Sequence, residues 1–377
     1  MKRIFALSLP LLVSATAFGG AFTAGDLVVV TVGNGTSLNG NATAGALYEY
    51  SIGGSLVQTI NLPTAASGAN YALTFSGSAS SEGFLHLSTD GNYLTLAGYN
   101  AAPGTTTPQS SAASAINRVV GLVATATGNI NTTTALGDAY SGSNIRSAFS
   151  TDGINLWTTG NAGSGLGSTA GNRYTTTGSS TSTQLNSTTS NNRVGNIFNG
   201  QLYTSASSGT FLGVGTVGTG APTTSGQTLT LLPGMPTSGT HSPYDFWFRD
   251  ANTLYVADDG AVGAGGGIQK WTFDGTTWTL QYTLLNNGTT TTGCRGLIGE
   301  VDGSGNTDLF ATTSISSTAN TLIEVVDTGA SASPTVIATA PTGDAFRGVA
   351  LLVPEPGSFA LAGLGLLVLA ACKRWRR

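Results

Sequence analysis

The chain has 377 residues, of which only 8% are charged, and its formal net charge is −4. Residues 18 to 353 hold 17 acidic and 8 basic side chains, so this central body is more acidic than the whole chain. That balance argues against nucleic-acid binding, which requires a basic surface. An apolar content of 40% argues against disorder. Cys294 is the lone cysteine of the body, so no disulfide can form within it.

The N-terminus has the three parts of a secretory signal peptide. Met1 to Arg3 is basic, Ile4 to Val13 is apolar, and Ala15 and Ala17 satisfy the small-x-small rule for signal peptidase. We predict a signal peptide over residues 1–17, with cleavage after Ala17, or alternatively after Ala21.

Short apolar segments separated by turn residues follow, and the clearest unit lies in the second half of the chain. Its four predicted strands are 244–249, 253–257, 267–273 and 277–284, with Asp250-Ala251-Asn252 and Asp274-Gly275 at two of the turns. Asp-Gly and Asn-Gly are the dipeptides preferred at tight hairpin corners. No sustained helical period occurs between the two ends of the chain. We therefore expect an all-β body over residues 18–352.

The first strand of this unit and the turn after it recur along the chain. Corresponding pairs flank the turns at Asp90-Gly91, Asp152-Gly153, Asn199-Gly200 and Asp302-Gly303, and the units begin near residues 82, 145, 192, 244 and 294. Phe346 to Leu352 is a sixth opening strand without partners after it. The first exported segment instead supplies three strands without an opener (27–32, 46–52 and 56–62).

Combining the two ends gives six four-stranded blades, with the last strand of the chain completing the first blade. Such closure leaves only short, protected sheet edges. The phrase from Trp271 to Trp278 resembles bacterial secreted β-propellers, and this resemblance also implies a β-propeller body. A pair of β-sandwiches or a β-helix is the structural alternative.

Side chains suited to catalysis are few. His86 and His241, the two histidines, belong to different repeats, and Cys294 has the pattern of a small buried residue. Asp258-Asp259 is predicted to be a solvated loop pair, with a position facing a central channel as the alternative. The carboxylates that could serve an enzyme are Glu82, Asp245, Asp258, Asp259 and Asp344. We assign no catalytic residue.

One loop has the pattern of a calcium site. Oxygen-bearing side chains occupy every second position at Glu300, Asp302, Ser304, Asn306 and Asp308. Alternating oxygen ligands on a loop bent by glycine are how calcium gathers six or more contacts. The loop resembles the calcium loops of FG-GAP propeller repeats, although Ser304 and Asn306 replace carboxylates. An ordinary Asp-Gly hairpin corner is the favoured interpretation, and calcium is the alternative.

The C-terminal 25 residues form a tripartite tail. Val353, Pro354, Glu355 and Pro356 form a stiff strip, an apolar helix is predicted over about 357–372, and 373–377 is a basic cap. A helix of that length extends about 24 Å, short of the ~30 Å hydrocarbon core, which suits a transient membrane anchor. The tail, 353–377, resembles the PEP-CTERM sorting domain of bacterial surface proteins. This resemblance implies export and recognition by a membrane transpeptidase of the exosortase type.

These features predict an exported, exosortase-sorted β-propeller that acts without catalysis at the cell surface or in the extracellular matrix, associated with exopolysaccharide. It would pass through a membrane-anchored intermediate and need no cofactor except the calcium considered above. The alternative is a secreted propeller enzyme or glycan-binding module acting on extracellular polysaccharide, with Asp258 or Glu82 as a channel carboxylate.

Overall fold

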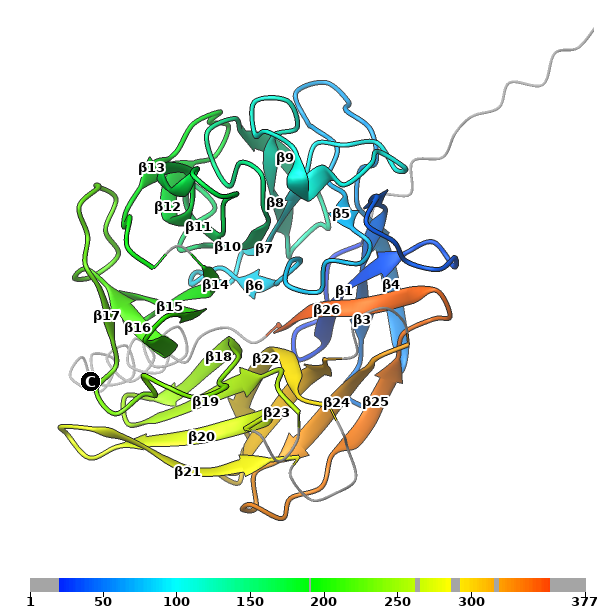
Figure 1. The fold of residues 1–377 in the computed structure, drawn as a ribbon. Helices are drawn as coiled ribbons and strands as arrows, with labels where there is room; N and C mark the ends of the chain where they lie inside the picture. The colour runs from blue at the N-terminus through cyan, green and yellow to red at the C-terminus, as the bar shows by residue number, and fades with distance from the viewer. Residues whose placement is uncertain (1–19, 190, 262–264, 286–291, 315–318, 353–377) are drawn as a thin grey trace, which may run out of the picture.

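Six four-stranded antiparallel sheets surround a common centre (Figure 1). The computed structural model describes residues 20–189, 191–261, 265–285, 292–314 and 319–352. The signal peptide and the sorting tail predicted above lie outside these ranges. In the described ranges, no helix has the length and apolar character needed to cross a membrane.

Each sheet is one blade of a β-propeller, as the sequence predicted. Every blade after the first uses four strands that are consecutive along the chain: β6 (His86–Leu87), β7 (Tyr93–Tyr99), β8 (Arg118–Ala124) and β9 (Ile130–Leu136); β10 (Ile145–Ser150), β11 (Asn155–Gly160), β12 (Gly171–Thr176) and β13 (Thr183–Gln184); β14 (Asn192–Phe198), β15 (Gln201–Ser208), β16 (Phe211–Val217) and β17 (Leu229–Leu231); β18 (Pro243–Asp250), β19 (Thr253–Asp258), β20 (Gly267–Phe273) and β21 (Trp278–Leu284); β22 (Cys294–Val301), β23 (Thr307–Thr313), β24 (Thr321–Val326) and β25 (Thr335–Thr339).

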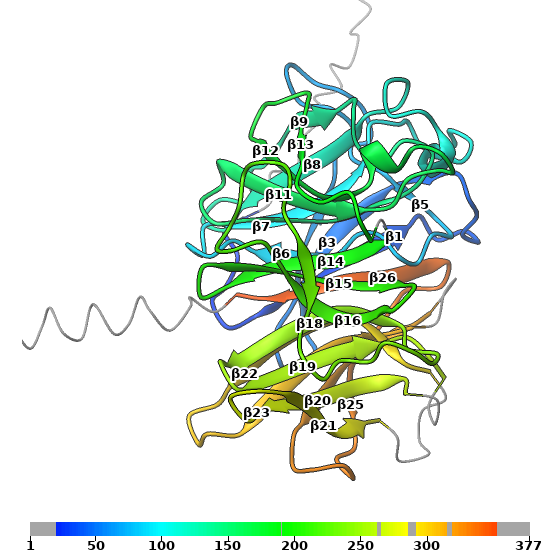
Figure 2. The ribbon, with the colours of Figure 1, turned by 60° about the vertical axis from the view of Figure 1, so that its left-hand side comes forward.

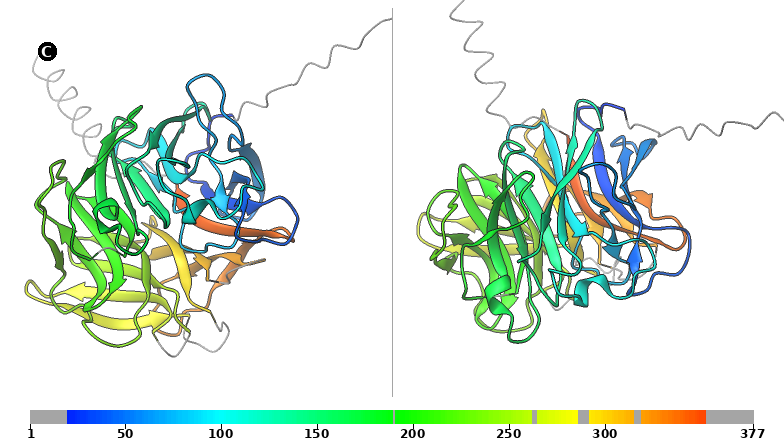
Figure 3. Two further views of the ribbon diagram at one scale, coloured as in Figure 1. Left: turned by 45° about the horizontal axis from the view of Figure 1, so that its top comes forward. Right: turned by 90° about the horizontal axis from the view of Figure 1, so that it is seen from above.

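The first blade joins the two ends of the body. Its order is β26 (Asp344–Leu351), β1 (Leu27–Gly33), β3 (Gly45–Tyr50) and β4 (Leu56–Asn61). Leu27 pairs with Leu351 and Gly33 with Asp344, so the last strand of the body lies along the full length of the first. Figure 3 shows β1 in blue beside β26 in orange-red from two directions. The predicted ring closure is confirmed.

Smaller elements fill the connections between strands. β2 (Ala42–Thr43) pairs with β5 (Phe75–Ser76), and two short 3-10 helices, η1 (Pro108–Ser110) and η2 (Gly167–Thr169), lie in loops of neighbouring blades. Figure 2 shows the sheets following one another around the ring. Apolar clusters bury the faces between successive sheets. The largest joins the first two blades through Val28, Leu47, Leu96 and Val119, among others.

Turn chemistry explains where the hairpins form. Asn199 and Gly200 both have positive φ, 48° and 75°, and connect Phe198 directly to its partner Gln201, as expected of a type I′ corner. The Asp-Gly corners are longer than the predicted two-residue turns. At Asp152 the carboxylate accepts the backbone N–H groups of Ile154 and Asn155, at 2.9 and 2.8 Å, and so caps the turn itself.

Candidate functional site

The inner strands of the blades carry a ring of large side chains near the point where each strand begins. Arg146 lies on β10, Arg193 on β14, Tyr244 on β18, Arg295 on β22 and Arg347 on β26. In each of these strands the pairing with its neighbour shifts register at or next to that residue. A bulge bends the strand and redirects its side chain. The repeat therefore aims one large residue from each of these five blades toward the centre.

Tyr244 occupies the middle of this layer. The guanidinium carbon of Arg193 lies 4.0 Å from the centroid of its ring, and that of Arg295 lies 5.5 Å away. Phe84, just before β6, stacks on the same ring with centroids 5.8 Å apart. Since β6 belongs to another blade, Tyr244 and Phe84 meet across the centre and close the channel at this level.

Two glycines allow the inner strands to approach one another around the arginines. A Cβ atom on Gly296 would lie 2.8 Å from the carbonyl oxygen of Arg347, and one on Gly348 would lie 2.2 Å from the backbone nitrogen of Leu85. Any side chain at these positions would collide with backbone. In each Arg-Gly pair, 295–296 and 347–348, the arginine supplies a cation and the glycine allows close contact with the neighbouring inner strand.

Three of the arginines connect one blade to the next. Arg146 donates to the carbonyl of Asn192 at 3.2 Å, Arg193 to that of Pro243 at 3.1 Å, and Arg347 to that of Gly77 at 2.9 Å. Arg295 instead forms an ion pair with Asp259 at 2.8 Å. This layer was not predicted from the sequence. The available signal was the recurrence of arginine near the start of four opening strands.

The carboxylates singled out in the sequence lie close to this layer but are held by structural contacts. Glu82 is buried and accepts hydrogen bonds from the backbone N–H of Ser76, from Tyr99 Oη at 2.7 Å and from Asn144 Nδ2 at 2.9 Å. Burial raises its pKa to about 7, although these hydrogen bonds and Arg347 oppose the rise.

The prediction that Asp258-Asp259 is a solvated loop pair is wrong. Asp258 ends β19, is 1% exposed, and accepts the backbone N–H groups of Ser242 and Gly260, at 2.8 and 2.9 Å. Asp259 pairs with Arg295. Both carboxylates therefore hold loops and an arginine in place beside the channel.

The remaining candidates are also bound within the fold. Asp245 is buried and accepts the N–H groups of Phe246 and Leu297, at 2.9 and 3.2 Å, so it joins two neighbouring inner strands. Burial raises its pKa to about 8. Asp344 accepts the N–H of Gly35 at 2.9 Å.

The histidines and the cysteine occupy unrelated places. His86 is buried edge-on against Phe149, and burial lowers its pKa to about 4. His241 is half-buried in the loop before β18. Cys294 is buried, and burial raises the pKa of its thiol to about 12, which leaves it unreactive.

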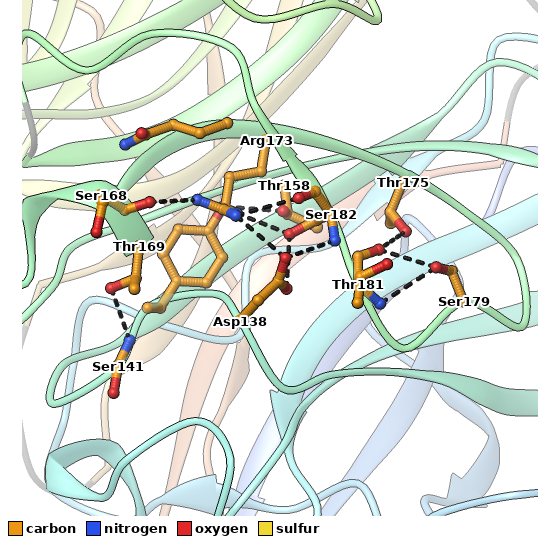
Figure 4. A network of polar contacts seen from close by, with 12 residues as sticks. Asp138, Ser141, Thr158, Ser168, Thr169, Arg173, Thr175, Ser179, Thr181 and Ser182 are labelled. Carbon is orange, nitrogen blue, oxygen red and sulfur yellow. Dashed lines mark hydrogen bonds and ion pairs between the residues drawn. The ribbon is translucent and has the colours of Figure 1, made fainter.

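A second buried polar network lies farther out, where Asp138 meets β12 (Figure 4). Arg173 bonds through Nε to Ser182 Oγ at 2.7 Å, through Nη1 to the carbonyl of Ser168 at 3.0 Å, and through Nη2 to Asp138 at 3.3 Å. The same carboxylate accepts the N–H of Ser182 at 2.8 Å. Every nitrogen of this guanidinium has a partner, so we assign the network to the attachment of β13.

The predicted calcium loop joins β22 to β23. Asp302 accepts the N–H groups of Ser304 and Asn306, each at 2.8 Å, which is the geometry of a capped turn. Glu300 and Asp308 are cross-strand neighbours, and burial together with nearby carboxylates, including Asp302, raises the pKa of both. Within the described residues, no group of three or more acidic, histidine or cysteine side chains has the arrangement of a metal site.

Calcium binding at this loop therefore stays a prediction. If the ion binds, millimolar calcium will raise the melting temperature of the protein, because a ligand that binds only the folded state stabilises it. Asp302→Ala will abolish that increase, while Asp274→Ala, at the turn between β20 and β21 of the preceding blade, will retain it. Scanning calorimetry with and without calcium makes the measurement. A melting temperature that does not respond to calcium would identify the loop as a hairpin turn.

Comparison with known proteins identifies the tail. Residues 352–377 match the model of the PEP-CTERM protein-sorting motif, a match that includes Val353 to Pro356. The motif implies export and processing by exosortase, a membrane enzyme. A search of curated proteins found no match.

Solved structures with some likeness to the chain share little sequence with it. The GH74 enzyme of Niastella koreensis is 16% identical, with a TM-score of 0.44 over 88% of this chain and 46% of that one. The chain thus spans less than half the length of that enzyme. Apo AztD from Citrobacter koseri is 11% identical (TM-score 0.30; 82% and 70% covered), and AofleA from Arthrobotrys oligospora is 10% identical (TM-score 0.31; 86% and 89% covered).

Proposed function

We propose that the chain, sorted through its PEP-CTERM motif, acts outside the cell as a non-catalytic β-propeller of the surface or extracellular matrix, associated with exopolysaccharide. In this proposal the mature protein lacks the signal peptide and the tail after about Pro356. The membrane-anchored form is an intermediate of that processing.

The observation that supports a non-catalytic role is the use of the carboxylates near the channel. Hydrolysis of a glycosidic bond usually needs two carboxyl groups about 5 to 10 Å apart that are free to meet the substrate. Glu82, Asp245, Asp258 and Asp344 each accept at least one backbone N–H, and Asp259 neutralises Arg295. A carboxylate committed in this way would have to break a structural contact to serve as an acid or a nucleophile.

The two ends of the body suggest how the mature protein is presented. The backbone N–H of Gly25 donates to the carbonyl of Leu352 at 2.9 Å, so the first described residues lie beside the start of the tail. Arg347 is five residues earlier on β26, about 17 Å away at the rise of an extended strand. A chain held at a surface through its tail would therefore turn the arginine layer away from that surface.

Incubation of the protein with the host's exopolysaccharide tests the proposal. The exported chain is purified from its host, its intact mass is measured to establish the processed ends, and the polymer is then sized by chromatography. We expect unchanged polymer length and co-elution of part of the protein with it. Polymer shortening that is lost in Asp258→Asn or Glu82→Gln, but kept in Asp90→Asn at an exposed turn, would establish the enzyme instead.

A further inference from the structure

The arginine layer concentrates positive charge in an otherwise acidic body. Four of the eight basic residues of the body are Arg146, Arg193, Arg295 and Arg347. Besides the contacts of Arg193 and Arg295 with the ring of Tyr244, the other two arginines interact electrostatically with the hydroxyl group of the same residue. Four guanidinium groups from four blades therefore surround one aromatic side chain.

Most of this charge has no ion-pair partner among the described residues. Among the described residues, Arg295 is the member of the layer that forms an ion pair, with Asp259. Arg146 and Arg347 are 8% and 4% exposed. The Nε atoms of Arg146, Arg193 and Arg347 are buried without a hydrogen-bond partner in the described structure. The buried carboxylate of Glu82 acts electrostatically on Arg347. That carboxylate already accepts hydrogen bonds from Ser76, Tyr99 and Asn144.

A purely structural role would use the donors of these arginines more fully. Arg118, which is completely buried, gives six hydrogen bonds to surrounding loop atoms, although its Nε also has no partner in the described structure. Arg173 has a partner for every nitrogen, including a carboxylate. By contrast, one hydrogen bond is found for Arg347 and two for Arg146 in the described structure. Burying a cation without a partner is costly, and a bound anion removes that cost.

A small cavity adjoins the layer. It has a volume of about 10 Å³ and is lined by Glu82, Phe84, Arg295 and Arg347 together with Ser80, Thr312, Thr313 and Phe346. Such a volume holds about one group of the size of a water molecule. A ligand would thus insert a single oxygen atom here and keep the rest of its body outside.

We propose that the arginine layer binds an oxyanion group, a carboxylate or a sulfate. The group comes either from a free ion or from an acidic sugar of an extracellular polymer. Guanidinium forks match the paired oxygens of both groups. Anion binding at this layer could occur whether or not the protein is an enzyme. A failure of the binding test therefore differs from a failure of the polymer-length experiment above.

Titration calorimetry of the exported chain, at constant ionic strength, tests the site with four probes. Sodium sulfate and sodium galacturonate should bind, and neutral galactose should not. An oligogalacturonate that binds more tightly than the monomer indicates a polymer as the source, while equal or weaker binding indicates a free ion. No heat of binding from sulfate or galacturonate at millimolar concentration, with folded protein, would overturn the proposal.

Variants locate the binding. Arg347→Gln and Arg146→Gln should each weaken binding at least about tenfold, because each removes charged hydrogen-bond donors. Arg249→Gln is the matched control, since it removes the same charge from a side chain that is a third exposed and paired with Asp250 near the end of β18. If a buried variant fails to fold, the half-buried Arg193→Gln carries the same expectation. If Arg249→Gln weakened anion binding equally, the effect would come from overall charge, and the proposed site would be refuted.

Discussion

Ending the chain after Ala345 will destroy the stable fold of the entire ring, whereas ending it after Leu352 will leave stability unchanged. The first truncation removes most of β26, the inner strand of the first blade, whose eight residues are all buried. It also exposes the edge of β1, in which six of seven residues are buried. An apolar edge of this kind pairs with other chains and aggregates.

The size of the effect follows from what β26 buries. Phe346, Val349 and Leu351 pack in one apolar cluster with Leu27 and Tyr50. Burial of each such side chain contributes about 1.5–3 kcal/mol, so their joint loss approaches the 5–15 kcal/mol total stability of an average domain. The lost ladder between β26 and β1 adds to this.

Thermal unfolding and size-exclusion chromatography of the two truncated chains make the comparison. We expect the chain ending at Leu352 to be monodisperse, with a cooperative transition. The chain ending at Ala345 should aggregate or melt far lower. Similar melting temperatures for the two would contradict closure of the ring through β26.

The blade architecture was predictable because its signals are local. An apolar strand followed by a turn, as at the start of the unit from Tyr244 to Leu284, predicts a hairpin independently of the rest of the chain. Repetition of the unit then gave the number of blades, and the unpartnered strands at the two ends gave the closure. Edge strands such as β13 and β17 had no comparable signal, because half-exposed short strands lack an apolar pattern.

The central site could not be predicted in the same way. Arg146 and Arg347 are 201 positions apart, and only the ring brings them to one layer. The one local difference from Arg249 is position, because Arg249 lies near the end of β18, where it is partly exposed. The carboxylates were misjudged for a related reason. Asp258 follows an apolar strand and precedes glycines, a context typical of an exposed loop. Its carboxylate is instead enclosed by the N–H of Gly260 from this loop and the N–H of Ser242 from the loop before β18.

Stability will fall as pH rises from about 6.5 to 8.5, and Asp245 will be the main cause. Burial raises its pKa from the ordinary value to about 8, and that of Glu82 to about 7. Both groups therefore hold a proton in the folded state at pH values where the unfolded chain has lost it. The folded protein therefore loses stability as pH rises from the ordinary carboxyl pKa to the folded pKa, where each loss is complete. For Asp245 the whole loss is about 5 kcal/mol, of which about 2 kcal/mol falls above pH 6.5.

The window above pH 6.5 isolates these two carboxyls. Burial lowers the pKa of His86 to about 4, so this group adds stability as pH rises, but that gain is complete near the ordinary histidine value. Asp152 and Asp302 have lowered pKa values because turn N–H and amide groups bond to their carboxylates, and their contributions are complete at still lower pH. Neither kind of group changes the pH dependence of the unfolding free energy above pH 6.5.

Urea unfolding at intervals from pH 6.5 to 8.5 measures the effect. The wild-type protein should lose stability up to about pH 8 and level off above it. Asp245→Asn keeps one of the two oxygens that accept the N–H groups of Phe246 and Leu297, and should remove most of the pH dependence of stability. Glu82→Gln should remove a smaller part. Asp90→Asn, at an exposed turn, should leave the slope as it is. A wild-type stability that is constant or rises over this range would mean that Asp245 is ionised in the folded ring, with its charge compensated by Phe246 and Leu297.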